Sequence, residues 1–139
     1  MSTEQNKSAA RRFVEQGFNQ KNLAELDTYF SANLVDHALP PMLPPGREGR
    51  KMFYSAFISA FPDIHLHIDD LLAEGDRVVL RWSAHGTQTG ELMGIPPTGK
   101  QVNMSGIAID RFENGQSVEH WEVFDQMGLM QQLGVIPAQ

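Results

Sequence analysis

The sequence predicts an α+β fold in which helices come first and a curved antiparallel β-sheet follows. Helical spacing of apolar residues dominates up to Phe61, and Pro62 then ends the last of these helices. Beyond Pro62 apolar and polar residues alternate, and turn sequences at 74–76 and 113–115 separate the alternating segments. This order excludes a parallel sheet built from crossovers. We predict a single domain over residues 1–139, with helices packed over the sheet and a pocket between the two layers.

Three helices are predicted in the first half of the chain. Asn22 is suited to cap the second of them, with Glu25 three residues later as in a capping box. In the third, Phe53 and Phe57 share the inner face at helical spacing. The three helices are expected at 4–19, from Asn22 onward and at 47–61.

Five strands and a closing helix complete the prediction. The strands are expected at 34–37, 63–72, 77–87, 102–112 and 116–124, and the helix at 126–133. Two loops, 39–46 and 86–100, mix turn residues with apolar side chains. We expect the second loop to be packed as a lid.

Composition and charge exclude several classes of protein. Seventeen acidic residues against 11 basic ones give a net charge of −6, whereas a nucleic-acid binder needs a basic face. The acidic balance also argues against an anionic membrane surface, and no apolar run is long enough to span a bilayer. Cysteine is absent, so thiol chemistry is excluded. The polar N-terminus without a signal-peptide core predicts a soluble, cytoplasmic protein.

The joint between the last strand and the closing helix carries one carboxylate, Asp125. Because side chains alternate along a strand, Trp121, Val123 and Asp125 point the same way. Asp125 is either the cap of the closing helix, with a lowered pKa, or a base in an apolar pocket, with a raised pKa. The residues alone leave both interpretations open.

Other candidates for the site are distributed along the chain. His37 ends a short strand and is either a surface imidazole or an acid that donates to a carbonyl oxygen. Trp82 and Trp121 lie on apolar strand faces, as core residues or as pocket walls that stack on a planar ligand. Phe53, Phe57 and Met104 are further candidate walls of the pocket, since Met adapts to irregular ligands, although such residues also simply fill core gaps.

A metal site is considered and rejected. His65 and His67 lie two residues apart on one strand face and could contact a single ion. The only further ligand in sight is Asp69, whereas structural zinc has four ligands. We interpret this face as a polar outer surface and predict no metal.

Two strings in the second half resemble a known family. They are GTQTGELMGIPPTGKQV, from Gly86, and GIAIDRFENGQSVEHWEVFDQMGLMQQLG, from Gly106. They resemble the SnoaL-like polyketide cyclases, also called ester cyclases, of the nuclear transport factor 2-like superfamily. The resemblance extends from the first helix to the end of the chain. It implies a cone-shaped, curved sheet wrapped round a pocket with helices over its open side, and a homodimer.

The same resemblance implies roles for individual residues. An aspartate on the last long strand of these cyclases is the general acid/base, and it matches Asp125; no metal or organic cofactor is used. His37, in VDHALP, matches a recurrent feature. Where many relatives have histidine in GTHTG, this chain has Gln88, which we expect at the substrate; it can donate a hydrogen bond but cannot supply a proton near neutral pH.

These observations lead to one main hypothesis and two alternatives. The main one is a cofactor-free enzyme that performs intramolecular aldol cyclisation on an apolar, carbonyl-bearing small molecule. The alternatives are a non-catalytic protein that binds a small apolar ligand, and an isomerase or hydrolase of the same fold, because the fold alone does not establish the reaction.

Overall fold

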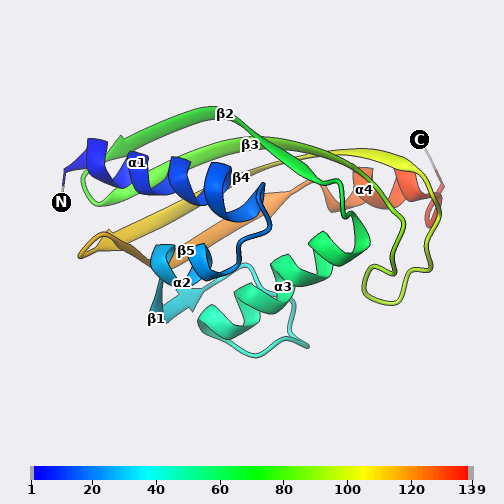
Figure 1. The fold of residues 1–139 in the computed structure, drawn as a ribbon, viewed down its shortest axis with the longest axis horizontal. Coiled ribbons are helices and arrows are strands. Elements are labelled where there is room, and N and C mark those ends of the chain that lie inside the picture. The colour runs from blue at the N-terminus through cyan, green and yellow to red at the C-terminus, as the bar shows by residue number, and fades with distance from the viewer. Residues whose placement is uncertain (1, 138–139) are drawn as a thin grey trace.

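The computed structural model describes residues 2–137, which form helices packed on one face of a curved five-stranded sheet (Figure 1). The strand order is β1-β5-β4-β3-β2, and the sheet does not close into a barrel. The elements are α1 (Thr3–Arg12), η1 (Phe13–Phe18), α2 (Ala24–Tyr29), β1 (Phe30–Asp36), α3 (Gly46–Ala60), β2 (His65–Glu74), β3 (Arg77–Thr87), β4 (Gln101–Glu113), β5 (Gln116–Phe124) and α4 (Gln126–Leu133). The predicted α+β class is confirmed.

The sheet follows the predicted meander except at one edge. β2, β3, β4 and β5 pair antiparallel in sequence order. Hairpin turns at Gly75 and at Asn114-Gly115 join β2 to β3 and β4 to β5, and a long loop between Thr87 and Gln101 joins β3 to β4. β1 instead pairs with β5 in parallel, so the antiparallel pattern does not extend to this edge. A parallel neighbour requires a crossover, and the chain between β1 and β5 provides one. β1 begins at Phe30, four residues before the predicted start.

The first helical segment matches its prediction, and the second begins differently. Ser2 caps α1 in a capping box with Gln5, and the helix continues without a break into η1, a π-helical segment that contains Phe13 and Phe18. The predicted Asn22 cap is wrong: α2 starts at Ala24, with Leu23 at the cap position and no side-chain hydrogen bond. The backbone amide of Asn22 instead donates to the Gly17 carbonyl, which closes the preceding turn.

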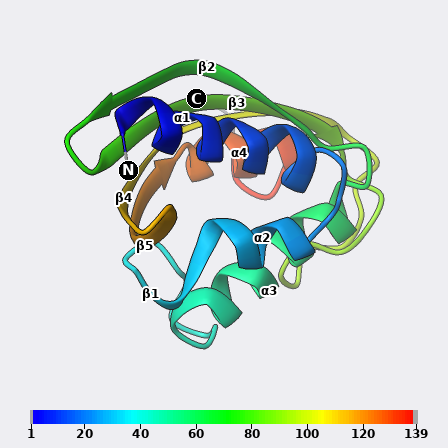
Figure 2. The ribbon, with the colours of Figure 1, turned by 60° about the vertical axis from the view of Figure 1, so that its left-hand side comes forward.

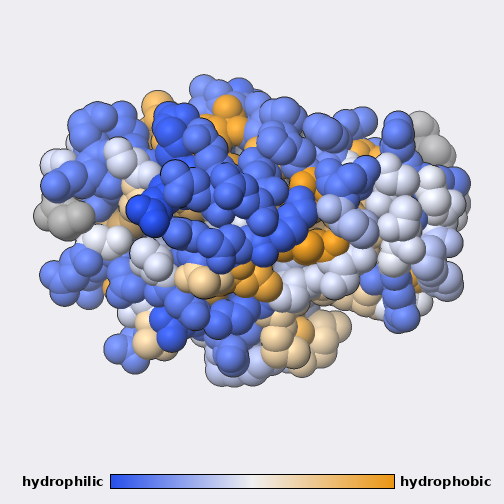
Figure 3. All heavy atoms as spheres, in the orientation of Figure 1, coloured by the Kyte–Doolittle hydropathy of each residue, from blue (hydrophilic) through white to orange (hydrophobic). Residues whose placement is uncertain are grey.

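The sheet arches over the helices (Figure 2). Buried apolar side chains fill the space between the two layers. Two clusters of buried residues make up this core, one centred on Phe61 and Trp82 and the other on Phe13 and Phe30. The helical face is hydrophilic over α1, with hydrophobic atoms visible between α1 and α3 (Figure 3). Within residues 2–137, no helix has the length and apolar character needed to cross a membrane.

Candidate functional site

A cavity of about 70 Å³ lies between the inner face of the sheet and the helices. Aromatic rings form most of its wall, and polar side chains gather at one end. The aromatic residues that line it are Phe13, Phe18, Tyr29, Phe30, Phe53, Tyr54, Phe57, Trp82 and Phe124. An apolar, ring-lined space with a few convergent polar groups is the form that small-molecule sites take.

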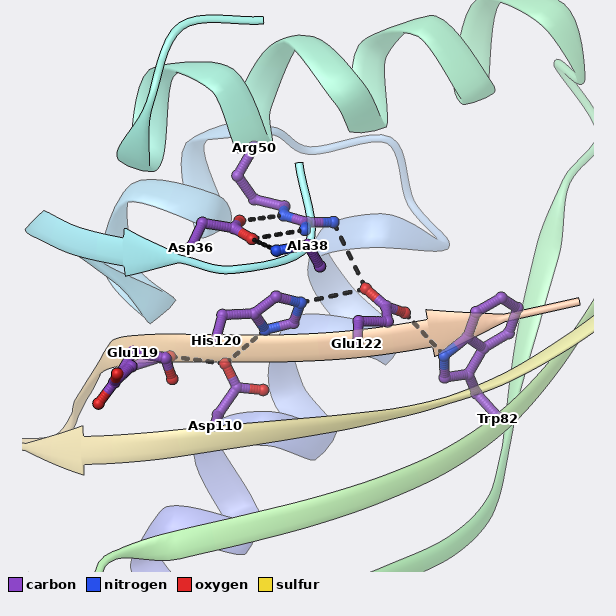
Figure 4. Close-up of polar contacts among 9 residues, drawn as sticks. Asp36, Ala38, Arg50, Trp82, Asp110, Glu119, His120 and Glu122 are labelled. Atoms are coloured by element: carbon purple, nitrogen blue, oxygen red, sulfur yellow. Dashed lines mark hydrogen bonds and ion pairs between the residues drawn. The ribbon is translucent and has the colours of Figure 1, made fainter. Parts of the chain in front are cut away.

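The polar end of the cavity is built on β4 and β5. His120 and Glu122 lie two residues apart on β5, so their side chains share the inner face of the sheet. Asp110 pairs with His120 across the two strands. The His120 Nδ1 lies 2.8 Å from an Asp110 oxygen and its Nε2 lies 3.1 Å from a Glu122 oxygen, so the imidazole bridges the two carboxylates (Figure 4).

A buried ion pair from β1 and α3 extends this cluster. Arg50 donates to both oxygens of Asp36, at 2.7 and 3.0 Å, and reaches Glu122 at 3.4 Å (Figure 4). Only 1% of the Arg50 side chain and none of the Asp36 side chain is exposed. Burial alone would raise the pKa of the Asp36 carboxyl, but the Arg50 hydrogen bonds and charge hold it below its ordinary value.

Trp82 supplies a third donor to Glu122. Its indole Nε1 donates to the second Glu122 oxygen at 2.8 Å. Gly106, directly across from Trp82 on β4, makes room for the ring: a Cβ at this position would lie 2.6 Å from a Trp82 ring carbon. Together with His120 and Arg50, the indole fixes the orientation of the Glu122 carboxylate toward the cavity end.

The ionisation states of His120 and of two buried tyrosines are set by burial and by the groups around them. Burial would lower the pKa of His120, but the charge and hydrogen bond of Asp110 and the hydrogen bond of Glu122 raise it to about 10. His120 is therefore a cation at neutral pH. The phenols of Tyr29 and Tyr54 line the same cavity, and burial raises the pKa of both, so they stay protonated donors.

Four of the residues that the sequence assigned to substrate binding line this cavity. Trp82 and Met104 come from β3 and β4, and Phe53 and Phe57 from α3. The structure therefore brings the two layers of predicted walls together around one space. Whether they contact a substrate stays a prediction.

Asp125, Trp121 and Val123 share a face of the sheet as predicted, but it is the outer face. Val123 is 73% exposed, and an Asp125 oxygen accepts the Gly128 amide at 2.9 Å as the cap of α4. The expected position of Trp121 in the cavity wall is therefore corrected. Since β5 alternates strictly here, the inward positions belong to His120, Glu122 and Phe124. The catalytic role of Asp125 stays a prediction, at a carboxylate outside the cavity lining.

His37 also lies away from the cavity. Its ring stacks on Trp121 with a centroid distance of 5.1 Å, and its Nε2 lies 2.7 Å from a Glu119 oxygen. Its side chain is 44% exposed. The structure does not bring His37 and Asp125 together with the cavity residues, so a shared acid/base pair between them finds no support in this geometry.

Gln88 is buried in the 86–100 loop and outside the cavity lining. Its amide nitrogen donates to the carbonyls of Ile95 and Pro96, and its oxygen accepts from the amide and hydroxyl of Thr98. These four bonds hold the loop in its packed form, with Leu92 in the core. The side chain organises the loop, and the contact of Gln88 with substrate stays a prediction.

The remaining histidines form a surface group. The rings of His65 and His67 lie 4.6 Å apart on β2, and His85 of β3 lies beside them. Within residues 2–137, no three histidine or acidic side chains are arranged to hold a metal ion.

The sequence patterns do not predict the charged cluster formed by Asp110, His120 and Glu122. On β5 the apolar residues Trp121 and Val123 favour the opposite face as the buried one. The turn at Asn114-Gly115 does not predict this pairing, because its register alone would place Asp110 opposite Glu119. An irregularity between Arg111 and Phe112 shifts the register by one residue, so that Asp110 pairs with His120. Nothing in the local sequence indicates that Arg50 reaches them.

Comparisons with known proteins agree with this architecture. A model of the family described as SnoaL-like polyketide cyclase matches residues 8–133. TsrD from Streptomyces laurentii superposes with a TM-score of 0.88 at 28% identity, over 98% of this chain and 99% of that one. No curated protein matches.

Two further solved structures carry different descriptions. AclR from Streptomyces galilaeus, called a "putative hydroxylase", has a TM-score of 0.88 at 29% identity, over 99% of this chain and 86% of that one. IdmH from Streptomyces antibioticus, called a "putative polyketide cyclase", has a TM-score of 0.80 at 31% identity, over 94% and 99%. The fold is common to both descriptions and does not fix the chemistry. The chain belongs to the SnoaL-like polyketide cyclase family.

Proposed function

We propose that this protein is a cofactor-free acid/base enzyme of the cyclase type, with Glu122 as the base. The observation that carries the proposal is the position of Glu122. Its carboxylate lies at the end of the aromatic cavity and is 13% exposed. The side chains of Arg50 and Asp36 in the same cluster are only 1% and 0% exposed. Glu122 also lines a surface pocket beside Ala38 and Gln126, so it can be reached from two sides.

The proposed reaction begins with a carbon acid. Glu122 accepts a proton from a carbon next to a carbonyl, and the electron pair of the broken C–H bond forms an enolate. The Tyr54 phenol lines the same cavity and donates a hydrogen bond to the enolate oxygen. The His120 imidazolium contributes its positive charge only, because both of its N–H groups are bound to Asp110 and Glu122. The enolate carbon then bonds to a second carbonyl carbon of the same molecule, whose oxygen takes up a proton, and a ring closes.

The walls of the cavity suit an apolar, planar substrate. Trp82 and Phe57 come from opposite layers and both face the cavity, together with Phe124 at the end of β5. Aromatic rings bind planar molecules by stacking and by burial of apolar area. An apolar carbonyl compound would place a compact part of its structure here, because the cavity volume is about 70 Å³, and its carbonyl group at Glu122.

The test compares two carboxylates on opposite faces of the sheet. Hydrogen–deuterium exchange next to the carbonyl of 2-tetralone, followed by NMR, measures enolate formation without knowledge of the natural substrate. We expect Glu122→Gln to lower the exchange rate by about a hundredfold or more, and Asp125→Asn to leave it unchanged. A loss of exchange in Asp125→Asn with full activity in Glu122→Gln would return the base to Asp125.

A second candidate function is binding without catalysis. The observation that favours it is that three donors already occupy the two Glu122 oxygens, which leaves the carboxylate well suited to hold an orientation. Ligand binding that quenches Trp82 fluorescence, with no exchange in any ketone, would favour this candidate. An isomerase or hydrolase using the same base would be distinguished by the structure of its product.

We also propose a homodimer that pairs the outer faces of two sheets. Ile107 and Val123 face each other across β4 and β5 and are both exposed, with Trp121 and Ile109 as the next cross-strand pair. Paired apolar residues on a solvent face are typical of interfaces. Sedimentation velocity at micromolar concentration tests this: Val123→Lys should give a monomer, and Met42→Lys, an equally exposed site in the β1–α3 loop, should leave the dimer intact.

A further inference from the structure

We propose that the cavity binds a small organic cation, a ligand that carries a positively charged nitrogen inside its aromatic wall. This inference goes beyond the proposed reaction, because it concerns charge recognition and requires no turnover. It rests on the charge of the polar end, on the burial of that charge and on the rings around it.

The polar end carries more negative than positive groups. Three carboxylates, Asp36, Asp110 and Glu122, are joined by ion pairs to two cations, Arg50 and His120. With all five ionised the cluster has a net charge of −1, and with a neutral His120 it would be −2. The sign is therefore the same for either state of the imidazole. Among residues 2–137, the cavity lining includes no lysine or arginine that would reverse it.

Most of this excess charge is removed from water, with Glu122 the most accessible of the three carboxylates at 13% exposure. The side chains of Asp110 and His120 are 5% and 2% exposed, and Asp36 is fully buried. A buried carboxylate without full compensation is costly, because the protein interior screens its charge far less than water does. A cation that enters the cavity beside Glu122 and Asp110 would balance the excess at the place where it lies.

The wall of the cavity favours the same ligand. The faces of aromatic rings attract cations that lie within about 6 Å of the ring centre, most strongly when water is excluded. The protein already uses this interaction at the site: the Arg50 guanidinium lies 5.1 Å from the ring centres of both Phe53 and Tyr54. Rings of Phe13, Tyr29 and Trp82 line the remainder of the space.

The size of the cavity restricts the ligand to a compact charged group. A volume of about 70 Å³ suits an ammonium or trimethylammonium head rather than a large polycyclic cation. Combined with the proposed function, this describes a substrate with a carbonyl group and a protonated or quaternary nitrogen close together.

The experiment compares two molecules of nearly equal shape. Choline and 3,3-dimethylbutan-1-ol differ in that a neutral carbon replaces the charged nitrogen, and isothermal titration calorimetry measures the affinity of each. We expect choline to bind the wild-type protein at least tenfold more tightly than the alcohol. Equal affinities, tighter binding of the alcohol, or no binding of either molecule would each overturn the proposal.

Matched variants then assign the selectivity to the cavity. Glu122→Gln should bring the ratio of the two affinities toward one, while Glu119→Gln, a neighbouring carboxylate bound to Arg111 on the outer face, should leave it at the wild-type value. A wild-type ratio of the two affinities in folded Glu122→Gln, or a ratio near one in Glu119→Gln, would contradict the assignment. If Glu122→Gln does not fold, as judged by circular dichroism, the wild-type ratio and Asp110→Asn decide.

The two proposals fail separately. Selectivity for choline without ketone exchange contradicts only the reaction, whereas exchange without selectivity contradicts only the cation. The calorimetric ratio is measured with molecules that cannot form an enolate, so it does not depend on the identity of the base.

Discussion

The two faces of β5 differ in a way that reverses the usual pattern of a sheet. The inward face carries charged side chains, His120 and Glu122, whereas the outward face carries Trp121 and the largely exposed Val123. Buried charges occur where they are paired and have a use, and exposed apolar pairs occur where another surface covers them. The comparison teaches that alternation predicts which residues share a face but not which face is inside.

The inward charges are tolerated because each has a partner. Glu122 receives three donors, Asp110 receives the Ser117 hydroxyl and His120, and Asp36 receives two bonds from Arg50. On the outward face the polar groups are exposed pairs such as Arg81 with Asp70. The same residue types therefore contribute very differently to stability on the two sides, and variants can measure that difference.

The largest expected effect is the loss of Arg50. Arg50→Ala leaves Asp36 and Glu122 buried without their shared cation, which should reduce the free energy of unfolding by about 3–5 kcal/mol. Urea unfolding followed by circular dichroism measures it. Arg81→Ala is the matched control on the outer face, where an exposed pair contributes little, so its urea midpoint should stay close to the wild-type value. Equal losses in both variants would contradict the comparison.

The second effect is the pH dependence of stability. The pKa of His120 is raised from 6.5 to about 10 in the folded protein, so its stabilising contribution is fully present below pH 6.5. That contribution is lost as the pH rises toward 10, because the folded cation must then release its proton. The urea midpoint should therefore decrease as the pH is raised from 7 to 10, a range in which most lysine side chains still keep their protons.

His120→Asn provides the matched test of that dependence. The variant cannot hold a proton between the two carboxylates, so its stability should be lower at pH 7 and should change less between pH 7 and pH 10. His37→Asn, on the outer face, should retain the wild-type slope. A wild-type midpoint that is flat over this range would show that His120 is not held as a cation.

The fold was predictable from the sequence to a large extent, and the site was not. Hairpin turns and the two periodicities placed β3, β5 and α4 at their observed bounds, because these signals are local. The parallel edge strand β1 and the Arg50–Asp36 pair depend on contacts between distant segments, for which local pattern gives no signal. Gln88 illustrates the same limit: its four bonds are to a loop whose path only the folded chain defines.

Asp125 gives the smallest expected effect and the sharpest test of the comparison. As the cap of α4, it should be replaceable by Asn with little change in stability, because Asn caps as well as Asp. Asp125→Ala should cost about 1 kcal/mol in urea unfolding, since the Gly128 amide loses its acceptor. The family resemblance instead implies that this carboxylate is the acid/base, which Asn cannot replace. An Asp125→Asn variant with wild-type stability but no hydrogen–deuterium exchange in 2-tetralone would therefore place the chemistry on the outward face of β5. The inward cluster would then have a structural role.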